Sequence, residues 1–169
     1  MKKLIFVFLL LLLFPTAVFA KQAVDYTLPY PGILPDNPLY TLKVVRDQVI
    51  GLLISDPLKK AEYDLLQADK RLASGVSLVK EGNAKYNLAV TTISKGENYF
   101  DEGIAKLALV GKQGIDVKSF ASTMNTAAQK HVEVLQGLEN QVNSSTKQDL
   151  IAQEKRVEAF EKRVSVLSQ

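Results

Sequence analysis

The chain has 169 residues, of which 47% are hydrophobic and 23% charged, and it contains one histidine and no cysteine. The lack of cysteine excludes disulfides, and with a single histidine it removes the usual ligands of zinc, haem and iron–sulfur centres and any cysteine nucleophile. The formal net charge is +3. Because Lys2 and Lys3 account for much of this excess, the rest of the chain lacks the clustered basic charge that nucleic-acid binding requires.

The first 20 residues have the three-part pattern of a secretory signal peptide. Residues 1–3 are cationic, residues 4–14 form an unbroken apolar run, and residues 16–20 end in the small Ala20 that a signal peptidase prefers. We expect cleavage after Ala20 and export across the cytoplasmic membrane, giving a secreted or envelope-associated protein. The alternative is an uncleaved membrane anchor, since residues 4–20 are at the short limit for spanning a bilayer.

A proline-rich segment follows the export signal. Four of the six prolines lie within residues 29–38, and they exclude helix and favour extended backbone. We therefore divide the chain into a signal peptide at 1–20, a proline-rich extended segment packing on the bundle at 21–37, and a helical bundle domain at 38–169. The segment is either a structural clasp, which its apolar side chains favour, or a peptide that docks in another protein's groove. The residues expected to carry either role are Tyr30, Pro31, Leu34, Pro35, Pro38 and Tyr40.

The remaining chain has apolar residues at steps of three and four, which predicts helices and no strand. The first helix runs from Pro38 to about Ser55, with an apolar face of Leu39, Leu42, Val45, Val49 and Leu52 or Leu53. The second starts at Pro57 and ends before Gly82, and the third covers about residues 83–110. The fourth runs from its cap at Asp116 to the break at 143–145, and the fifth starts at Ser145 or Thr146. Short connections between these five helices predict an all-α, up-and-down bundle.

Two features of the helices concern their packing. Gly96 and Gly103 lie seven residues apart on one stripe, which predicts either a close helix contact or a weak point, because each costs about 1 kcal/mol of helix propensity. Seven-residue spacing in the last two helices is typical of coiled-coil packing. We interpret it as packing within one bundle and not as a dimerising zipper, so a monomer is expected.

The polar residues show no constellation that predicts a catalytic or metal site. His131 lies on the apolar stripe of the fourth helix and is expected to be a packed core residue, because a lone histidine does not hold a metal. Glu97 and Asp101 are expected on exposed faces, where nothing would raise a pKa for acid–base work. The mixed charges of residues 59–64 and 68–72 are expected on a solvated face, with Lys60 paired to Asp64.

Three motifs resemble an uncharacterised bacterial family, a domain of unknown function found in exported or membrane-tethered proteins. They are PYPGILPDNPLYTLK at residues 29–43, DPLKKAE at 56–62 and ADKRL at 68–72. The resemblance covers about residues 26–100 and implies an extracytoplasmic helical domain with no established catalytic residue. Gly75 and the break at Gly82 interrupt a region that the family fills with stronger helix formers, which questions the continuity of the second helix.

Together these observations predict an exported, non-enzymatic helical domain that acts through a protein or cell-envelope partner. No cofactor or metal is expected, and membrane contact is expected only through an uncleaved N-terminal segment. The alternative is an extracytoplasmic sensor or regulatory domain tethered by that segment.

Overall fold

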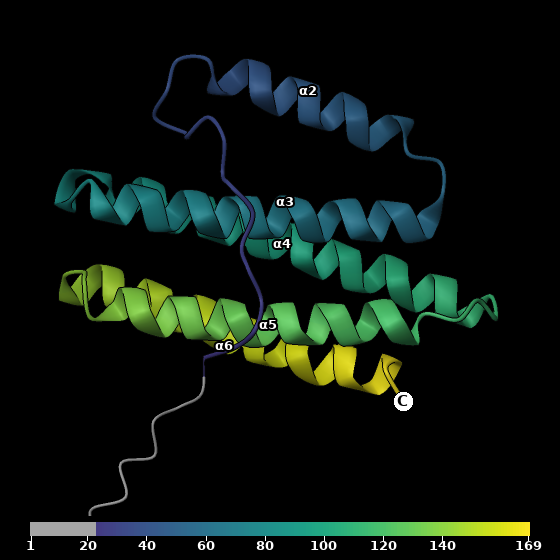
Figure 1. The fold of residues 1–169 in the computed structure, drawn as a ribbon. Coiled ribbons are helices and arrows are strands. Elements are labelled where there is room, and N and C mark those ends of the chain that lie inside the picture. Colours follow the sequence, from purple (N-terminus) through teal and green to yellow (C-terminus); the bar gives the residue numbers. More distant parts are fainter. Residues whose placement is uncertain (1–22) are drawn as a thin grey trace, which may run out of the picture.

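In the computed structural model, which describes residues 23–169, the chain forms five α-helices and one short 3₁₀ helix (Figure 1). The predicted signal peptide lies outside the described residues. The all-α prediction is confirmed, and the part of the chain that the structure describes contains no strand. The elements are α2 (Tyr40–Leu53), α3 (Pro57–Lys80), η1 (Asn83–Lys85), α4 (Tyr86–Lys112), α5 (Lys118–Glu139) and α6 (Ser144–Leu167).

Local capping explains where several helices begin. The Asp56 side chain accepts a hydrogen bond of 3.0 Å from the Lys59 N–H, with Pro57 in the first turn, as the sequence predicts. Three predicted starts need correction. The residue directly before α5 is Val117 and not Asp116, although the Asp116 side chain accepts a hydrogen bond of 3.0 Å from the Lys118 N–H. Asn143, not Ser145 or Thr146, caps α6, since its side chain accepts from the Thr146 N–H at 2.9 Å. Residues 34–39 form turns, so that α2 begins two residues after Pro38.

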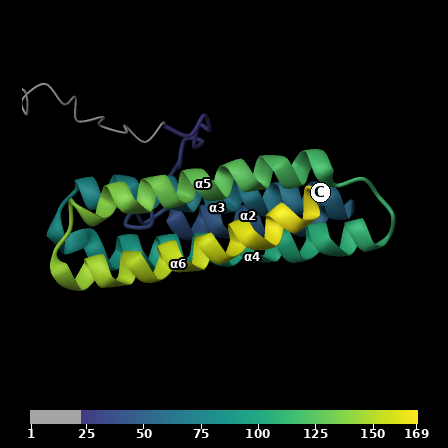
Figure 2. The same cartoon turned by 90° about the horizontal axis from the view of Figure 1, so that it is seen from below.

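Consecutive helices run antiparallel, which confirms the up-and-down bundle (Figures 1 and 2). α3 packs along α4, α5 packs along α6, and these two pairs face each other. α5 and α6 are thus members of one bundle, as expected. Their shared core is aliphatic and aromatic, and its largest fully buried apolar side chains are Phe100, Leu72, Leu78, Ile93, Ile104, Leu107, Met124, Leu135 and Leu150.

Glycines allow α3 and α4 to approach closely. A Cβ atom added to Gly96 would lie 2.9 Å from the Cβ of Arg71, and one added to Gly103 would lie 3.3 Å from the Ala61 carbonyl oxygen. The close-contact prediction is therefore confirmed. Gly75 serves the same purpose from α3, because its Cβ would lie 2.4 Å from the side chain of Ile93. α3 is continuous through Gly75, which resolves the question about the continuity of this helix that the family resemblance raised.

Residues 23–39, here called the N-terminal strap, cross the bundle from α5 to α2 (Figure 1). Near its start, the Val24 N–H donates to Glu133 Oε2 on α5 at 2.6 Å. Tyr26 and Leu28 pack against the core. Further along, Asp36 forms an ion pair of 2.8 Å with Lys85. The strap thereby links the α5–α6 pair to the α3–α4 pair and leads the chain to α2.

α2 lies outside this four-helix core, above α3 and α4 (Figure 1). It has no extensive backbone packing with another helix of the described chain. None of the described helices is both long and apolar enough to cross a bilayer.

Candidate functional site

The residues of the proline-rich segment that were predicted to pack or dock differ in how exposed they are. Tyr30 is 83% exposed, and Pro38 is exposed as well. The prediction that Tyr30 packs on the bundle is therefore wrong. Pro31, Leu34, Pro35 and Tyr40 are half-buried. The chain turns at Gly32, where φ is +74°, and the side chains that contact the core come before this turn, from Tyr26 and Leu28.

α2 turns two of its three charged residues toward the bundle. Lys43 and Asp47 are both buried, with their charged atoms 3.7 Å apart. The Tyr63 hydroxyl of α3 donates to the backbone carbonyl of Asp47 at 2.8 Å. Burial lowers the pKa of Lys43, and the nearby Asp47 opposes this shift.

The apolar residues of α2 consequently point to solvent. The prediction that this face is buried is wrong, because the residues concerned are between 40% and 78% exposed. The predicted residues are Leu39, which directly precedes α2, and Leu42, Val45, Val49, Leu52 and Leu53, and Ile50 of the same helix is exposed beside them. The physical reason lies in α3, whose surface beneath α2 carries Tyr63 and Gln67. Such a surface pairs with the polar side of α2, and the apolar stripe of α3 is already used in the core.

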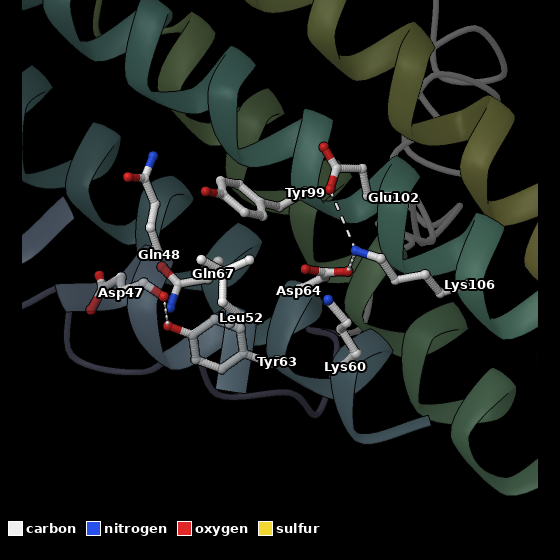
Figure 3. Close-up of a pocket in the computed structure, with 11 residues that line it drawn as sticks. Asp47, Gln48, Leu52, Lys60, Tyr63, Asp64, Gln67, Tyr99, Glu102 and Lys106 are labelled. Carbon is white, nitrogen blue, oxygen red and sulfur yellow. Dashed lines mark hydrogen bonds and ion pairs between the residues drawn. The ribbon is translucent and has the colours of Figure 1, made fainter. Parts of the chain in front are cut away.

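A groove of about 330 Å³ opens between α2, α3 and α4 beside this contact (Figure 3). α2 contributes Gln48 and Leu52, and α4 contributes Tyr99. Burial raises the pKa of Asp64, and its ion pair with Lys106 of α4 opposes the shift. Asp64 therefore pairs with Lys106 and not with Lys60 as the sequence suggested. The prediction of a solvated face is wrong for Asp64, which is buried.

A buried polar cluster lies deeper in the bundle, between α3, α4 and α5. His131 is fully buried, and its Nε2 and Nδ1 lie 2.9 Å from Asp69 Oδ1 and 3.0 Å from Glu97 Oε1. The Tyr26 hydroxyl of the strap donates to Asp69 Oδ2 at 2.6 Å. Both ring nitrogens therefore face carboxylate oxygens, an arrangement that favours the doubly protonated imidazolium.

The pKa values follow this geometry. Burial alone would lower the pKa of His131, but Glu97 and Asp69 raise it from 6.5 to about 9. Burial, followed by the charge and hydrogen bond of Asp69, raises the pKa of Tyr26, so its hydroxyl stays protonated as a donor. The carboxylates lie on opposite sides of the ring, and no group of ligating side chains suited to a metal occurs among the described residues.

His131 is buried as predicted, but its partners were missed. Glu97 is fully buried and Asp69 is nearly so, which contradicts the exposed faces expected for them. Their positions carried a signal. Glu97 lies four residues after Ile93 and three before Phe100, and Asp69 lies four after Leu65 and three before Leu72, so each carboxylate falls on an apolar stripe. Arg71 from the same motif is also buried, with its guanidinium carbon 4.2 Å from the centre of the Tyr99 ring.

The described residues thus form an all-α bundle with a buried ionic cluster and an apolar helix face directed outward. The chain belongs to the family described as Domain of unknown function (DUF5667), which matches residues 32–145. This confirms the predicted family and extends the match through α5, while most of α6 and the first half of the strap lie outside it. No curated protein matches the chain, and no solved structure does so.

Proposed function

We propose that the protein is an exported, non-enzymatic interaction domain whose contact surface is the outward face of α2. One observation carries the proposal: a helix that buries Lys43 and Asp47 while six of its aliphatic side chains remain in solvent. Isolated exposed apolar residues are ordinary, but a contiguous apolar patch marks an interaction site. Burying a Val or Leu side chain fully is worth about 1.5–3 kcal/mol, so a partner that covers α2 gains free energy that the isolated domain forgoes.

The polar groups support a role in structure and not in catalysis. The two ring nitrogens of His131 are both engaged, and the ring is inaccessible to solvent. A general acid or base must reach the proton it transfers. In the groove, Asp64 is paired with Lys106, so its carboxylate is held by a neighbouring side chain.

The proposal is compatible with either fate of the N-terminal segment. Val24 lies at α5, whereas α2 is on the opposite side of the bundle (Figure 1). A cleaved protein would be released outside the cytoplasmic membrane with α2 exposed. A tethered sensor would present α2 on the side of the bundle opposite Val24. Mass spectrometry of the protein from its native host distinguishes the two forms, since cleavage after Ala20 leaves Lys21 as the first residue.

Site-specific photo-crosslinking in the native host tests the contact surface. A photoreactive residue at Val49 should give protein adducts, whereas the same residue at Val166, which is 69% exposed on α6, serves as the matched control and should give none. Both sites are exposed apolar positions on helices, so they differ chiefly in the surface they report. Absence of protein adducts at Val49, or equal adducts at both sites, would contradict the proposal.

A further inference from the structure

A small cavity of about 220 Å³, here called the strap cavity, lies where the strap meets α2 and α3. The strap crosses α3 on its way to α2 (Figure 1). One wall of the cavity is the turn of the strap from Tyr30 to Ile33, which carries no charge. The other walls carry Lys43 and Arg46 of α2 and Lys70 of α3. The cavity thus brings together three cationic side chains from two helices.

The strap cavity holds more positive than negative charge. Asp47 Oδ1 lies 2.7 Å from the Arg46 guanidinium, and Asp47 Oδ2 lies 3.7 Å from Lys43 Nζ. Lys70 has no carboxylate within ion-pair distance among residues 23–169. A single carboxylate shared between two of the three cations leaves two formal positive charges without a counter-charge.

Lys43 is the member of this cluster whose burial requires an explanation. Its side chain is only 5% exposed, yet its distance of 3.7 Å from Asp47 Oδ2 exceeds that of a hydrogen bond. A buried ammonium is stable only when it is paired and hydrogen-bonded, because its removal from water is costly. Burial lowers the pKa of Lys43, and Asp47 opposes that shift. The positive charges of Arg71, Lys70 and Arg46 add to the lowering.

We infer that the strap cavity is a binding site for a phosphate group, taken as inorganic phosphate or as a phosphate monoester. Two uncompensated positive charges match a phosphate monoester, which carries a charge of about −1.5 to −2 at pH 7, better than they match a singly charged carboxylate. Lysine ammonium groups bind phosphate as point charges. The volume suits one such group, since pockets for drug-sized ligands measure about 300–1,000 Å³. Tyr30 lines the cavity and is 83% exposed, so the remainder of an esterified ligand can extend into solvent there.

A bound phosphate also holds α2 against the bundle. Lys43 of α2 and Lys70 of α3 line the same cavity and repel each other. An anion between them replaces this repulsion with two attractive contacts. A ligand that binds only the folded state stabilises it, so phosphate should raise the melting temperature and slow hydrogen exchange in α2. The strap cavity lies on the inner side of α2 and is separate from the outward face proposed above as a contact surface.

Calorimetric titration of the full chain with inorganic phosphate tests this inference, at constant ionic strength because salt screens exposed charges. We expect saturation at one site per chain. Lys70→Gln should weaken binding about tenfold or more, because it removes a charged partner of the phosphate. Arg46→Gln should do the same, and it keeps the test valid if Lys70→Gln does not fold, since the Arg46 side chain is 61% exposed. Lys155→Gln removes the same charge from an exposed position on α6 and is the matched control. Absence of saturable binding, or an equal loss in the control, would overturn the inference.

Two further probes identify the form of the ligand. Glycerol 3-phosphate that binds at least as tightly as inorganic phosphate would assign the site to an esterified phosphate, as in a phospholipid headgroup. Binding of inorganic phosphate alone would assign it to the free ion. Either result supports the inference when Lys70→Gln weakens the binding. Acetate that binds as tightly as phosphate would show a site for carboxylates and overturn it.

Hydrogen exchange locates the bound phosphate without relying on affinity. Saturating phosphate should slow exchange in α2 of the wild-type chain and have no such effect at the same concentration in Lys70→Gln. Unchanged exchange in wild-type α2 would place the ligand elsewhere and overturn the inference. None of these measurements involves Val49, so the photo-crosslinking test of the proposed function succeeds or fails separately.

Discussion

At the scale of single residues, His131 is held as a buried cation between Asp69 and Glu97. Burying charges costs free energy that an ion pair recovers only with close, hydrogen-bonded geometry. Here the ring nitrogens lie 2.9 and 3.0 Å from the carboxylate oxygens, and the strap adds the Tyr26 hydroxyl to Asp69. The cluster therefore joins four segments of the chain, and removing one member leaves the others without compensation.

The raised pKa of His131 makes stability depend on pH. Its folded pKa of about 9 exceeds the ordinary value of 6.5. The stabilisation is therefore fully present below pH 6.5 and is lost as pH rises through about 9, which corresponds to about 3 kcal/mol. We expect the urea midpoint to fall across this range, and NMR titration of the imidazole to give a midpoint near 9. An imidazole that titrates near 6.5 in the folded protein would contradict the ion-pair assignment.

Two tyrosines of the strap should respond differently to substitution. Tyr26→Phe removes the hydrogen bond to buried Asp69, and leaving such an acceptor unsatisfied costs about 1–3 kcal/mol. Tyr30→Phe changes a side chain that is mostly in solvent and should alter stability by less than about 0.5 kcal/mol. Urea unfolding of both variants measures the difference. Equal midpoints would show that the Tyr26 contact does not stabilise the fold.

At the scale of secondary-structure elements, α3 and α4 depend on close approach, whereas α2 depends on polar contacts. Gly96 sits against Arg71 and the backbone of Ala68, so the two helices pack nearly backbone to backbone. α2 is held instead by the Tyr63 hydroxyl of α3, which donates to the backbone carbonyl of Asp47, while buried Lys43 and Asp47 pair with each other within α2. A substitution on the outward apolar face of α2 should therefore change the stability of the fold less than a substitution at the contact between α3 and α4.

Gly96→Ala tests the close approach of α3 and α4. The added methyl group meets Arg71 Cβ at 2.9 Å, and overpacking of this kind costs about 1–3 kcal/mol. Gly137→Ala in α5 is the matched control, because nothing lies within 4 Å of its added Cβ, and alanine should there stabilise the helix by about 0.5–1 kcal/mol. Thermal melts should shift in opposite directions. A neutral or stabilising Gly96→Ala would contradict the packing.

The inverted orientation of α2 predicts unusual tolerance on its apolar face. Val49→Gln replaces a side chain that is 48% exposed on α2, and the free energy of unfolding should change by less than about 0.5 kcal/mol. Leu72→Ala in the core of α3 should cost about 2–5 kcal/mol. These values are compared in dilute protein, where association through α2 does not contribute. A large loss for Val49→Gln would place this face inside the bundle.

At the scale of the whole molecule, the strap connects the two helix pairs. It contacts α5 through Val24 and α3 through Tyr26, and its last part leads into α2. Contacts between residues so far apart in sequence are costly to form, but they make the fold cooperative. The strap should consequently stabilise the bundle as a unit.

Deletion of residues 21–28 tests this role. It removes the Tyr26 hydrogen bond and the burial of Leu28, which together should cost several kcal/mol, since the two contacts are worth about 1–3 and up to about 3 kcal/mol. Deletion of residues 21–23 is the control, because it stops before the Val24 contact with Glu133. The urea midpoint should fall for the longer deletion alone. Similar midpoints for the two proteins would show that the strap is dispensable.

The sequence alone determined the helices and the family. Apolar steps of three and four, together with the Asp56–Pro57 cap, are local signals, and they predicted five helices with nearly correct ends. The motifs at residues 29–43, 56–62 and 68–72 indicated the family that the match confirms. Gly96 and Gly103 also predicted the close helix contact. A glycine inside a helix lowers helix propensity, and a close contact with a neighbouring helix is a reason for its presence there.

Only the tertiary structure decided which faces meet. An apolar stripe shows that a helix has a face to bury but does not name the surface that covers it, and the polar surface of α3 selects the polar side of α2. Likewise, Asp69, Glu97 and His131 lie on three helices and up to 62 residues apart, so no local spacing brings them together. Their juxtaposition depends on how helices rotate and pack, and those degrees of freedom are fixed by contacts between distant segments.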